Sequence, residues 1–397
     1  MERSMSSPGS RLQEPMRILM ACGVPRRREG GVAALVYSLG GELEKRGHRV
    51  TYIFQEDLVD RAEVSQRFLD LVFSLRLSRY IARNHDKFSL VNLHAPVGFV
   101  YGFRRRWLAP RSSPPYVMTL HGLEERRVHV MRREFRKGRA WNFAAKNRFW
   151  HRLYIFPRFR WSIRNADGAH VFSRDVWNFL QLHYNLDSER LAYIPNGVDQ
   201  RFLLSRSYQR SGPLRLLYAG TWLDQRGIFY LREALQRLAP QLPGLSMTFA
   251  GGGCPPETIK DFFGPQLAST VVIVPTVPSE KMQQLYASHD IFLFPSLMEG
   301  LPNVLLEAMA SGMPVITSET CGMTDVVEDG YNGLLVRPAD ASAIEQAVLR
   351  LANSPDLAER LGRAAQQSMS RYTWERSAQL LENFFRRILA REGQSSA

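Results

Sequence analysis

Short runs rich in valine, isoleucine and leucine alternate with helical patterns along the whole chain, and this alternation restricts the fold strongly. Continuous apolar runs are typical of strands buried on both faces of a parallel sheet, with crossover helices between them. The runs are RILMACG, HRVTYIF, SLVNLHA, YVMTLHG, GAHVFS and LAYIPN, followed by LRLLYAG, LSMTFAG, VVIVPTV, DIFLFPS, PVITS and GLLVRP. The pattern predicts an α/β protein with two Rossmann-like domains.

A domain boundary is predicted within 201–213, where LLSRSYQRSGP combines polar residues with glycine and proline. A chain of 397 residues is too long for one ordinary core. We therefore expect a disordered lead-in at 1–15, a first domain at 16–205, a second at 206–373 and a final helix at 374–391. Two such domains leave a cleft between them, which is a common place for a ligand site.

The segment from 294 to 318, FPSLMEGLPNVLLEAMASGMPVITS, contains two glutamates separated by seven residues. Glu299 lies on a turn, and Asn303 is the expected N-cap of a helix that holds Glu307 in its first turns. Both carboxylates can face the crevice beyond a strand end, together with the free amides of Val304 and Leu305. Carboxylates that accept hydroxyl donors, beside amides that accept an anion, suit a nucleotide sugar. The alternative is an ordinary capped helix whose acid is solvated.

The joint occurrence of the Gly-Leu-Pro-Asn turn, both acids and the strand PVITS resembles the retaining glycosyltransferases of family 4, which have the GT-B fold and a Glu-x7-Glu motif. The resemblance covers nearly the whole chain and is densest from Leu214 to Arg337. It implies an enzyme of class EC 2.4 that moves a sugar from a nucleotide-sugar donor, UDP- or GDP-linked, to an acceptor hydroxyl. It also implies retained anomeric configuration, no metal, and a last helix that crosses back to the first domain.

The resemblance assigns roles within this segment. Glu307 would bind ribose hydroxyls, and Glu299 would hold hydroxyls of the transferred sugar and act in catalysis. Backbone amides around Leu301 to Val304, a turn that also contains Pro302 and Asn303, would complete the sugar pocket. Because the departing phosphate oxygen can take the acceptor proton in a same-face mechanism, the two glutamates are not the acid and nucleophile of a glycosidase.

Two loops of the first domain carry candidate residues. GVPRRREGGVAAL contains Gly30 and Gly31, which allow a close backbone approach to a ligand and match the family's Gly-Gly-Val loop between donor phosphate and acceptor. TLHGLE places His121 beyond a strand end, where the resemblance implies contact with the transferred sugar or acceptor and a catalytic role. Glu124 and His94 are weaker candidates in the same region, and a histidine satisfied by local hydrogen bonds is the alternative.

Loops of the second domain would hold the rest of the donor. YAGTWLDQRGIFYL has Thr221 where the family pattern has an arginine, and Arg226 where it has a lysine. Arg226 can neutralise two phosphates, while Gly220 and Thr221 supply amide or hydroxyl donors. Glycines of AGGGCPP, with Gly252 at their centre, allow close approach of a base or ribose. The backbone around Val277 is expected to read the base edge.

The three cysteines show neither metal-ligand spacing nor a pairing pattern, which suits a reducing cytoplasm and argues against a disulfide framework or a zinc site. No convincing lysine is present for a pyridoxal phosphate cofactor, and we expect no cofactor besides the co-substrate. No apolar run reaches the length of a membrane-spanning helix, and the N-terminal residues lack the apolar region of a signal peptide. We therefore expect a cytoplasmic protein.

The net charge of +14 is concentrated in an insertion at 104–164, where arginines and lysines are interleaved with tryptophan and phenylalanine. This mixture is typical of an interfacial membrane segment and favours peripheral contact with the anionic inner face of the plasma membrane. A solvated basic face is a serious alternative, and nucleic-acid binding is the least favoured.

Charge and resemblance together predict a glycan or lipid-linked acceptor, in the synthesis of a cell-surface polysaccharide. Two other functions remain open. One is a phosphorylase or hydrolase on the same GT-B scaffold. The other, from a different class, is a basic nucleic-acid-binding protein, which would be retained on polyanions with a steep salt dependence.

Overall fold

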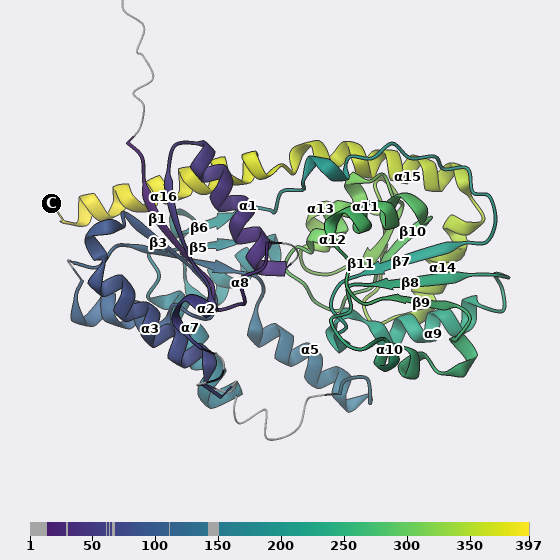
Figure 1. Cartoon of the computed structure of the whole chain (residues 1–397), viewed down its shortest axis with the longest axis horizontal. Helices are drawn as coiled ribbons and strands as arrows, with labels where there is room; N and C mark the ends of the chain where they lie inside the picture. The colour runs from purple at the N-terminus through teal and green to yellow at the C-terminus, as the bar shows by residue number, and fades with distance from the viewer. Residues whose placement is uncertain are drawn as a thin grey trace, which may run out of the picture.

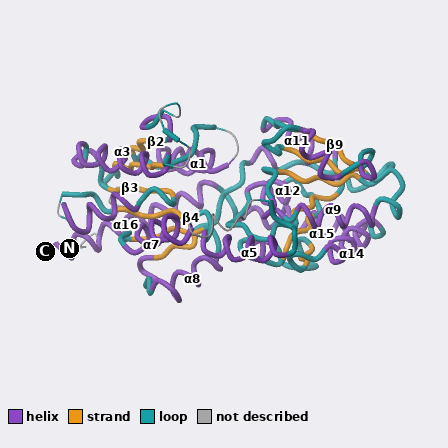
Figure 2. The backbone as a smooth tube through the Cα atoms, turned by 90° about the horizontal axis from the view of Figure 1, so that it is seen from below, coloured by secondary structure: helices purple, strands orange, loops and turns teal. Residues whose placement is uncertain are grey.

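A computed structural model of the chain describes residues 14–28, 31–60, 62, 64–65, 68–110, 112–141 and 151–396. Two six-stranded parallel sheets, each covered by helices, form two lobes that lie side by side (Figure 1). Figure 2 shows the strands of the two lobes as separate groups, with one helix, α5 (Glu124–Arg136), in the space between them. The predicted α/β architecture of two Rossmann-like units is confirmed.

The first sheet has the strand order β2-β1-β3-β4-β5-β6. Its strands are β1 (Arg17–Ala21), β2 (Arg49–Ile53), β3 (Leu90–His94), β4 (Tyr116–Leu120), β5 (Gly168–Val171) and β6 (Leu191–Tyr193). Its helices, besides α5, are α1 (Gly31–Lys45), α2 (Gln55–Leu58), α3 (Leu69–Arg83), α4 (Phe99–Phe103), α7 (Phe156–Arg164) and α8 (Arg174–Tyr184). The order reverses between β1 and β3, so ligands are expected beyond the carboxyl ends of these two strands.

The second sheet has the order β12-β11-β10-β7-β8-β9, in which the reversal lies between β7 and β10. Its strands are β7 (Arg215–Ala219), β8 (Ser246–Ala250), β9 (Val271–Val274), β10 (Ile291–Phe294), β11 (Val315–Ser318) and β12 (Leu334–Val336). Its helices are α9 (Ile228–Leu238), α10 (Pro256–Phe263), α11 (Ser279–Ser288), α12 (Asn303–Ala310), α13 (Met323–Val326), α14 (Ala341–Ala352) and α15 (Pro355–Ser368).

All twelve predicted strands form, and those inside each sheet are the most completely buried, whereas the edge strands β2 and β9 keep exposed residues. Every residue of β3, β4, β5, β10 and β11 is buried. A strand covered by helices on both sides cannot alternate polar and apolar residues, which is why continuous runs in the sequence identified these strands. The large buried rings of Tyr218, Phe249, Phe292 and Phe294 stack across the second sheet.

The last helix, α16 (Trp374–Ser396), crosses from the second lobe to the first, as the resemblance implied (Figure 1). Ser377 donates a hydrogen bond to the carbonyl of Pro195 at 2.8 Å. Farther along, the buried Phe384 and Ile388 pack against Gly168, where an added Cβ atom would lie 2.7 Å from either side chain. A glycine at the start of β5 therefore allows the helix to lie directly on the first sheet.

The helix α5 also joins the two lobes. The buried Glu134 accepts a hydrogen bond from the hydroxyl of Tyr230 on α9. Just beyond the helix, Arg139 forms an ion pair with Glu233 at 2.5 Å. The ring of Trp141 packs against Phe229 and Phe262 of the second lobe. This helix begins directly after the His121 loop, so one element connects that loop to the outer helices of the other lobe.

Candidate active site

The loops that follow the strands of both sheets enclose a cavity of about 710 Å³, which we call the glycine cavity. Its first-lobe wall is the start of α1 with the loop before it, and its second-lobe wall is built from the loops after β7, β8 and β9 and the start of α12. The lining includes Arg28, Gly31, Val32, Gly220, Thr221, Gly251, Gly253, Val277, Asn303, Val304, Glu307 and Trp374. Its size and its wall of bare backbone suit a ligand that approaches the main chain closely.

Two glycines fix the shape of this wall. Gly31 begins α1 with φ +69°, and Gly220 follows β7 with φ +132°. Side-chain-bearing residues rarely adopt these conformations, so glycine is required at the points where the backbone turns toward the cavity. Gly30, the other predicted glycine of the first loop, lies outside the described residues. Gly252 lies between the two cavity-lining glycines Gly251 and Gly253, but it does not line the cavity itself, and a Cβ atom added to it would lie 2.9 Å from Ile259.

Glu307 lies in α12 with its carboxylate at the edge of the glycine cavity. Its Oε2 accepts a hydrogen bond of 2.9 Å from the hydroxyl of Tyr286, a residue of α11 that the sequence had not suggested. Burial raises the pKa of Glu307 to about 7, although the Tyr286 hydrogen bond and Arg201 oppose the shift. A carboxylate in this position accepts hydroxyl donors well once it is ionised.

The start of α12 differs from the prediction in two details. The N-cap residue is Pro302, and Asn303 is the first residue of the helix. No side chain caps the helix start. The side-chain oxygen of Asn303 instead accepts a hydrogen bond of 2.7 Å from Asn196 of the first lobe. The amide of Leu305 is not free, because it donates to the carbonyl of Pro302 at 3.1 Å. These predictions were wrong because an interlobe partner and a tight first turn satisfy the groups.

The predicted turn residues hold this helix start in place. Asn196 donates a second hydrogen bond, of 3.0 Å, to the carbonyl of Leu301. Leu301 is buried, and neither it nor Pro302 lines the glycine cavity, whereas Asn303 and Val304 do. The IPNGVD segment of the first lobe therefore fixes the position of α12, in agreement with its interpretation as an architectural turn.

Arg226 and Glu299 form an ion pair, with 2.8 Å between Nη1 and Oε1. The guanidinium also lies over the ring of Phe294, 5.1 Å from its centroid. Burial raises the pKa of Glu299, while Arg226 and a hydrogen bond from Ser296 lower it. A Cβ atom at Gly220 would lie 3.9 Å from Nη1 of Arg226, so this cation borders the wall of the glycine cavity.

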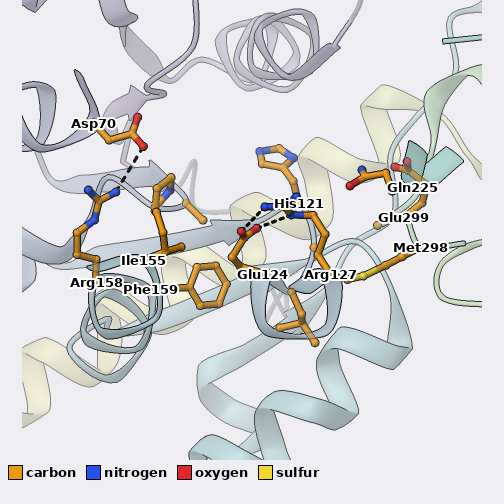
Figure 3. Close-up of a pocket in the computed structure, with 15 residues that line it drawn as sticks. Asp70, His121, Glu124, Arg127, Ile155, Arg158, Phe159, Gln225, Met298 and Glu299 are labelled. Carbon is orange, nitrogen blue, oxygen red and sulfur yellow. Dashed lines mark hydrogen bonds and ion pairs between the residues drawn. The ribbon is translucent and has the colours of Figure 1, made fainter. Parts of the chain in front are cut away.

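Glu299 itself lines a second cavity of about 370 Å³, which we call the histidine cavity after His121 (Figure 3). Charged side chains surround it: Asp70, Glu124, Arg127 and Arg158 from the first lobe, and Glu299 from the second. Apolar contacts come from Leu123, Ile155, Phe159 and Met298. The Arg226–Glu299 ion pair therefore lies between the two cavities, with the arginine toward one and the glutamate lining the other.

The two motif glutamates thus face different cavities. Glu299 lines the histidine cavity, whereas Glu307 lines the glycine cavity. The lobes are in close contact at the turn between them, because a Cβ atom at Gly300 would lie 2.3 Å from the carbonyl oxygen of His121. The absence of a side chain at Gly300 allows the His121 loop to lie against the second lobe.

Three histidines, His94, His121 and His170, lie close to one another at the histidine cavity, and His121 lines it. Nδ1 of His94 is 2.8 Å from Nε2 of His121, and the two rings stack with centroids 5.0 Å apart. Burial lowers the pKa of His121 to about 3 and of His170 to about 4, and it lowers the pKa of His94 well below its usual value. His121 is therefore neutral at physiological pH and serves as a hydrogen-bonding group rather than as a cation.

Several lining residues were not predicted from the sequence. They are Arg28, Arg201 and Trp374 in the glycine cavity, and Asp70, Arg127, Arg158 and Phe159 in the histidine cavity. Most belong to helices or to loops outside the motif segments, and they face the site only because the helices pack as they do. Arg28 could have been predicted from the sequence, because it lies just before the Gly-Gly turn of the first loop.

The basic segment at 104–164 contains β4 of the first sheet, so it is part of the domain rather than an insertion, and exposed apolar side chains lie on the helices around it. Trp107 is 64% and Leu108 67% exposed, on a π-helical turn (Arg104–Leu108) that continues α4. Phe103, one helical turn earlier, is also exposed, and its ring centroid lies 6.2 Å from that of Trp161 on α7. We call Phe103, Trp107, Leu108 and Trp161 the apolar patch. Within the described residues, no helix is both long and apolar enough to cross a membrane.

Comparisons with known sequences agree with these observations. The profile of Glycosyltransferase Family 4 matches residues 29–202, and that of the glycosyl transferases group 1 matches residues 213–354. An uncharacterised glycosyltransferase of Methanocaldococcus jannaschii is 24% identical over 284 residues, 72% of this chain and 72% of that protein. The amylovoran biosynthesis glycosyltransferase AmsK of Erwinia amylovora is 29% identical over 184 residues, 44% of this chain and 45% of that protein.

Solved structures show the same fold. Sucrose-phosphate synthase from Thermosynechococcus elongatus superposes with a TM-score of 0.75 at 19% identity, covering 94% of this chain and 99% of that one. HepE of Anabaena, in complex with UDP and glucose, superposes with a TM-score of 0.66 at 16% identity, covering 93% and 98%. The two family profiles match the two halves of the chain, and the solved structures share its two sheets and crossing helix. The chain therefore belongs to the group 1 and family 4 glycosyltransferases of GT-B fold.

Proposed function

We propose that this protein transfers a glycosyl group from a nucleoside diphosphate sugar to a hydroxyl of a glycan or lipid-linked acceptor. The observation that carries the proposal is the Arg226–Glu299 ion pair between two cavities, one lined in part by glycine backbone and one ringed by charged side chains. A donor whose phosphates reach Arg226 would have its sugar next to Glu299, at the entrance to the second cavity.

In this proposal the nucleotide occupies the glycine cavity. Glu307 accepts the ribose hydroxyls, and the backbone near Val277 contacts the base. Arg226, the amide at Gly31 and the hydroxyl of Thr221 offset the charge of the diphosphate. The amide of Gly220 does not contribute, because it donates to the carbonyl of Ala250 at 2.9 Å. The proposal requires no metal and no cofactor besides the donor. The complex of HepE with UDP and glucose supports this class of donor.

The histidine cavity would then hold the transferred sugar and the acceptor. Glu299 and the neutral His121 orient hydroxyl groups there through hydrogen bonds. The acceptor oxygen attacks the anomeric carbon from the face that the diphosphate leaves, and the departing phosphate oxygen takes the acceptor proton. Configuration at the anomeric carbon is retained. Arg226 offsets the negative charge that develops on the leaving diphosphate. Its interaction with the diphosphate becomes stronger as the bond between the anomeric carbon and the phosphate oxygen breaks.

We further propose that the apolar patch brings the enzyme to the anionic inner face of a membrane. Exposed tryptophan, phenylalanine and leucine can enter the headgroup region, and the exposed Arg106 and Arg164 on the same elements complement anionic lipids. Arg106 and Arg164 also line a cavity together with Ile388, Arg391 and Glu392, so this surface lies beside the C-terminal end of α16. The likeness to an amylovoran biosynthesis enzyme supports a role in surface polysaccharide synthesis.

A screen of UDP-, GDP- and ADP-sugars for thermal protection tests the donor assignment. A ligand that binds only the folded state stabilises it by mass action, by about 2.7 kcal/mol at a hundredfold excess over Kd. This stabilisation is measured as a higher melting temperature. One nucleotide should protect the protein strongly, and release of the free nucleoside diphosphate should depend on an added acceptor. Release without acceptor would indicate a hydrolase, and no protection by any nucleotide would refute the proposal.

A further inference from the structure

Arg158 of α7 is a buried cation whose hydrogen-bonding capacity is largely unused. The residue is only 6% exposed, and it lines the histidine cavity. Its guanidinium is held between aromatic rings, 4.2 Å from the ring centroid of Tyr154 and 5.0 Å from that of Phe99. Nη2 lies 3.4 Å from a carboxylate oxygen of Asp70, whereas Nε and Nη1 are buried without any hydrogen-bond partner. Figure 3 shows the guanidinium on the Asp70 side of the cavity.

This arrangement leaves a charge incompletely compensated. A buried charge destabilises the folded state unless it is paired and hydrogen-bonded. Aromatic rings stabilise the face of a guanidinium but accept none of the hydrogen bonds that its edge donates. The Asp70 carboxylate is partly solvated and reaches one nitrogen only, at a long distance. Two donors of the planar fork therefore lack an acceptor.

The other described charges of this cavity are already paired. Nε of Arg127 donates to Glu124 at 2.8 Å, and its Nη2 donates to the other oxygen of the same carboxylate. Glu299 is paired with Arg226. Among the described lining residues, Arg158 is therefore the cation whose unused donors are buried and lack an acceptor.

We propose that Arg158 binds an anionic oxygen group of the acceptor, a carboxylate or a phosphate, so that the enzyme acts on an acidic acceptor. This inference rests on the proposed function, which assigns the histidine cavity to the acceptor. Carboxylates and phosphates present two oxygens that match the guanidinium fork. Two sources supply this chemistry: a uronic acid within a glycan, and the phosphate that links a sugar to a lipid.

Binding of matched probes to the UDP-saturated protein tests the proposal. Methyl β-D-glucuronide is compared with methyl β-D-glucoside, and geranyl phosphate with geraniol, by titration calorimetry. For at least one pair the charged member should bind about tenfold more tightly than its neutral counterpart. The pair that discriminates identifies the source as glycan carboxylate or lipid phosphate. If neither charged probe binds more tightly than its neutral partner, the proposal is wrong.

Variants test whether Arg158 causes the preference for the charged probe. Arg158→Met keeps the length and apolar contacts but should abolish the discrimination, and Arg158→Lys should reduce it by keeping the charge without the fork. Arg160→Met, on the same helix but outside the cavity lining, should leave the discrimination unchanged. Unchanged discrimination in Arg158→Lys or in a folded Arg158→Met would overturn the assignment.

UDP protection separates this inference from the donor proposal. Arg158 does not line the glycine cavity, so UDP should protect Arg158→Met and the wild type equally. Normal UDP protection together with loss of the charge preference supports both ideas. Absence of protection by every nucleotide tested in the wild type would refute the donor site. Normal protection without any charge preference would refute the role of Arg158 alone.

Discussion

Arg226 and Glu299 are bound to each other across the boundary between two cavities, with Nη1 and Oε1 2.8 Å apart. Both side chains are largely buried, and Phe294 covers the face of the guanidinium. The pair belongs to two loops of the second sheet that lie beside its reversal of strand order, after β7 and after β10. The position at which an open α/β sheet binds ligands is thus occupied by one cation and one anion that neutralise each other.

Removing one member of this pair should destabilise the protein more than removing both. Arg226→Met leaves the Glu299 charge buried without its partner, at a cost of about 3 kcal/mol, whereas the double variant Arg226→Met/Glu299→Leu should recover much of that loss. Chemical unfolding followed by tryptophan fluorescence measures the coupling. The exposed pair Arg160–Glu125 is the control, with expected coupling below about 1 kcal/mol. Equal coupling in the two pairs would contradict a buried ion pair at the cavity boundary.

Glu307 should make stability depend on pH. Its carboxyl has a pKa of about 7 in the folded protein, against an ordinary value of 4.5. The folded state therefore keeps a proton that the unfolded chain loses, and the associated stability is complete below pH 4.5 and declines as the pH rises through 7. Relative to Glu307→Gln, the wild type should lose up to about 3 kcal/mol of unfolding free energy between pH 5 and pH 8. Parallel pH profiles for the two proteins would refute the shifted pKa.

The same titration should appear in donor binding. The ionised carboxylate accepts hydroxyl hydrogen bonds more strongly than the protonated form, so wild-type affinity for UDP should increase from pH 6 to pH 8. Glu307→Gln should bind UDP more weakly at pH 8 and lack this increase, and transfer should fall with it. An unchanged transfer rate in Glu307→Gln would rule out its assigned role.

The apolar patch should control membrane binding. Trp107→Ser with Leu108→Ser removes two exposed apolar side chains and should release the protein from vesicles that contain anionic phosphatidylserine. Val272→Ser is the matched control, because Val272 is 47% exposed on β9 of the other lobe. Co-sedimentation measures the bound fraction, and a soluble acceptor reports whether transfer is preserved. Vesicle binding that survives the double substitution would refute the patch as the contact surface.

The three arginines of α5 test a purely electrostatic contribution. Arg132, Arg133 and Arg136 are exposed. Their reversal to glutamate should weaken vesicle binding, and the effect should fade in high salt, because exposed charges are screened. Transfer to a soluble acceptor should continue at the wild-type rate. If vesicle binding is unaffected at low salt, α5 does not face the membrane.

The sequence predicted the sheets well because each buried strand is a local apolar run. The motif loops could also be placed, since turns after parallel strands must lie at one edge of a sheet. The pairing of Asn303 with Asn196, and that of Glu307 with Tyr286, was not predictable. The first pair joins residues 107 positions apart in different lobes, and the second joins two consecutive helices, so each depends on how whole elements pack. Arg158 was hidden for the same reason, because in the sequence it is one arginine among many.

The buried histidine pair offers a test of how His121 contributes. Its pKa of about 3 means that it stays neutral throughout the range from pH 5 to pH 8, so its own titration cannot shape the pH profile there. His121→Gln keeps a neutral hydrogen-bonding group and should lower kcat while leaving the profile from pH 5 to pH 8 unchanged in shape. By contrast, an acidic limb near pH 6.5 that disappears in His121→Gln would show that the imidazole titrates in the working enzyme. Because His94 contacts His121 through Nδ1 at 2.8 Å, His94→Phe should impair transfer by disturbing the orientation of His121, with UDP protection preserved.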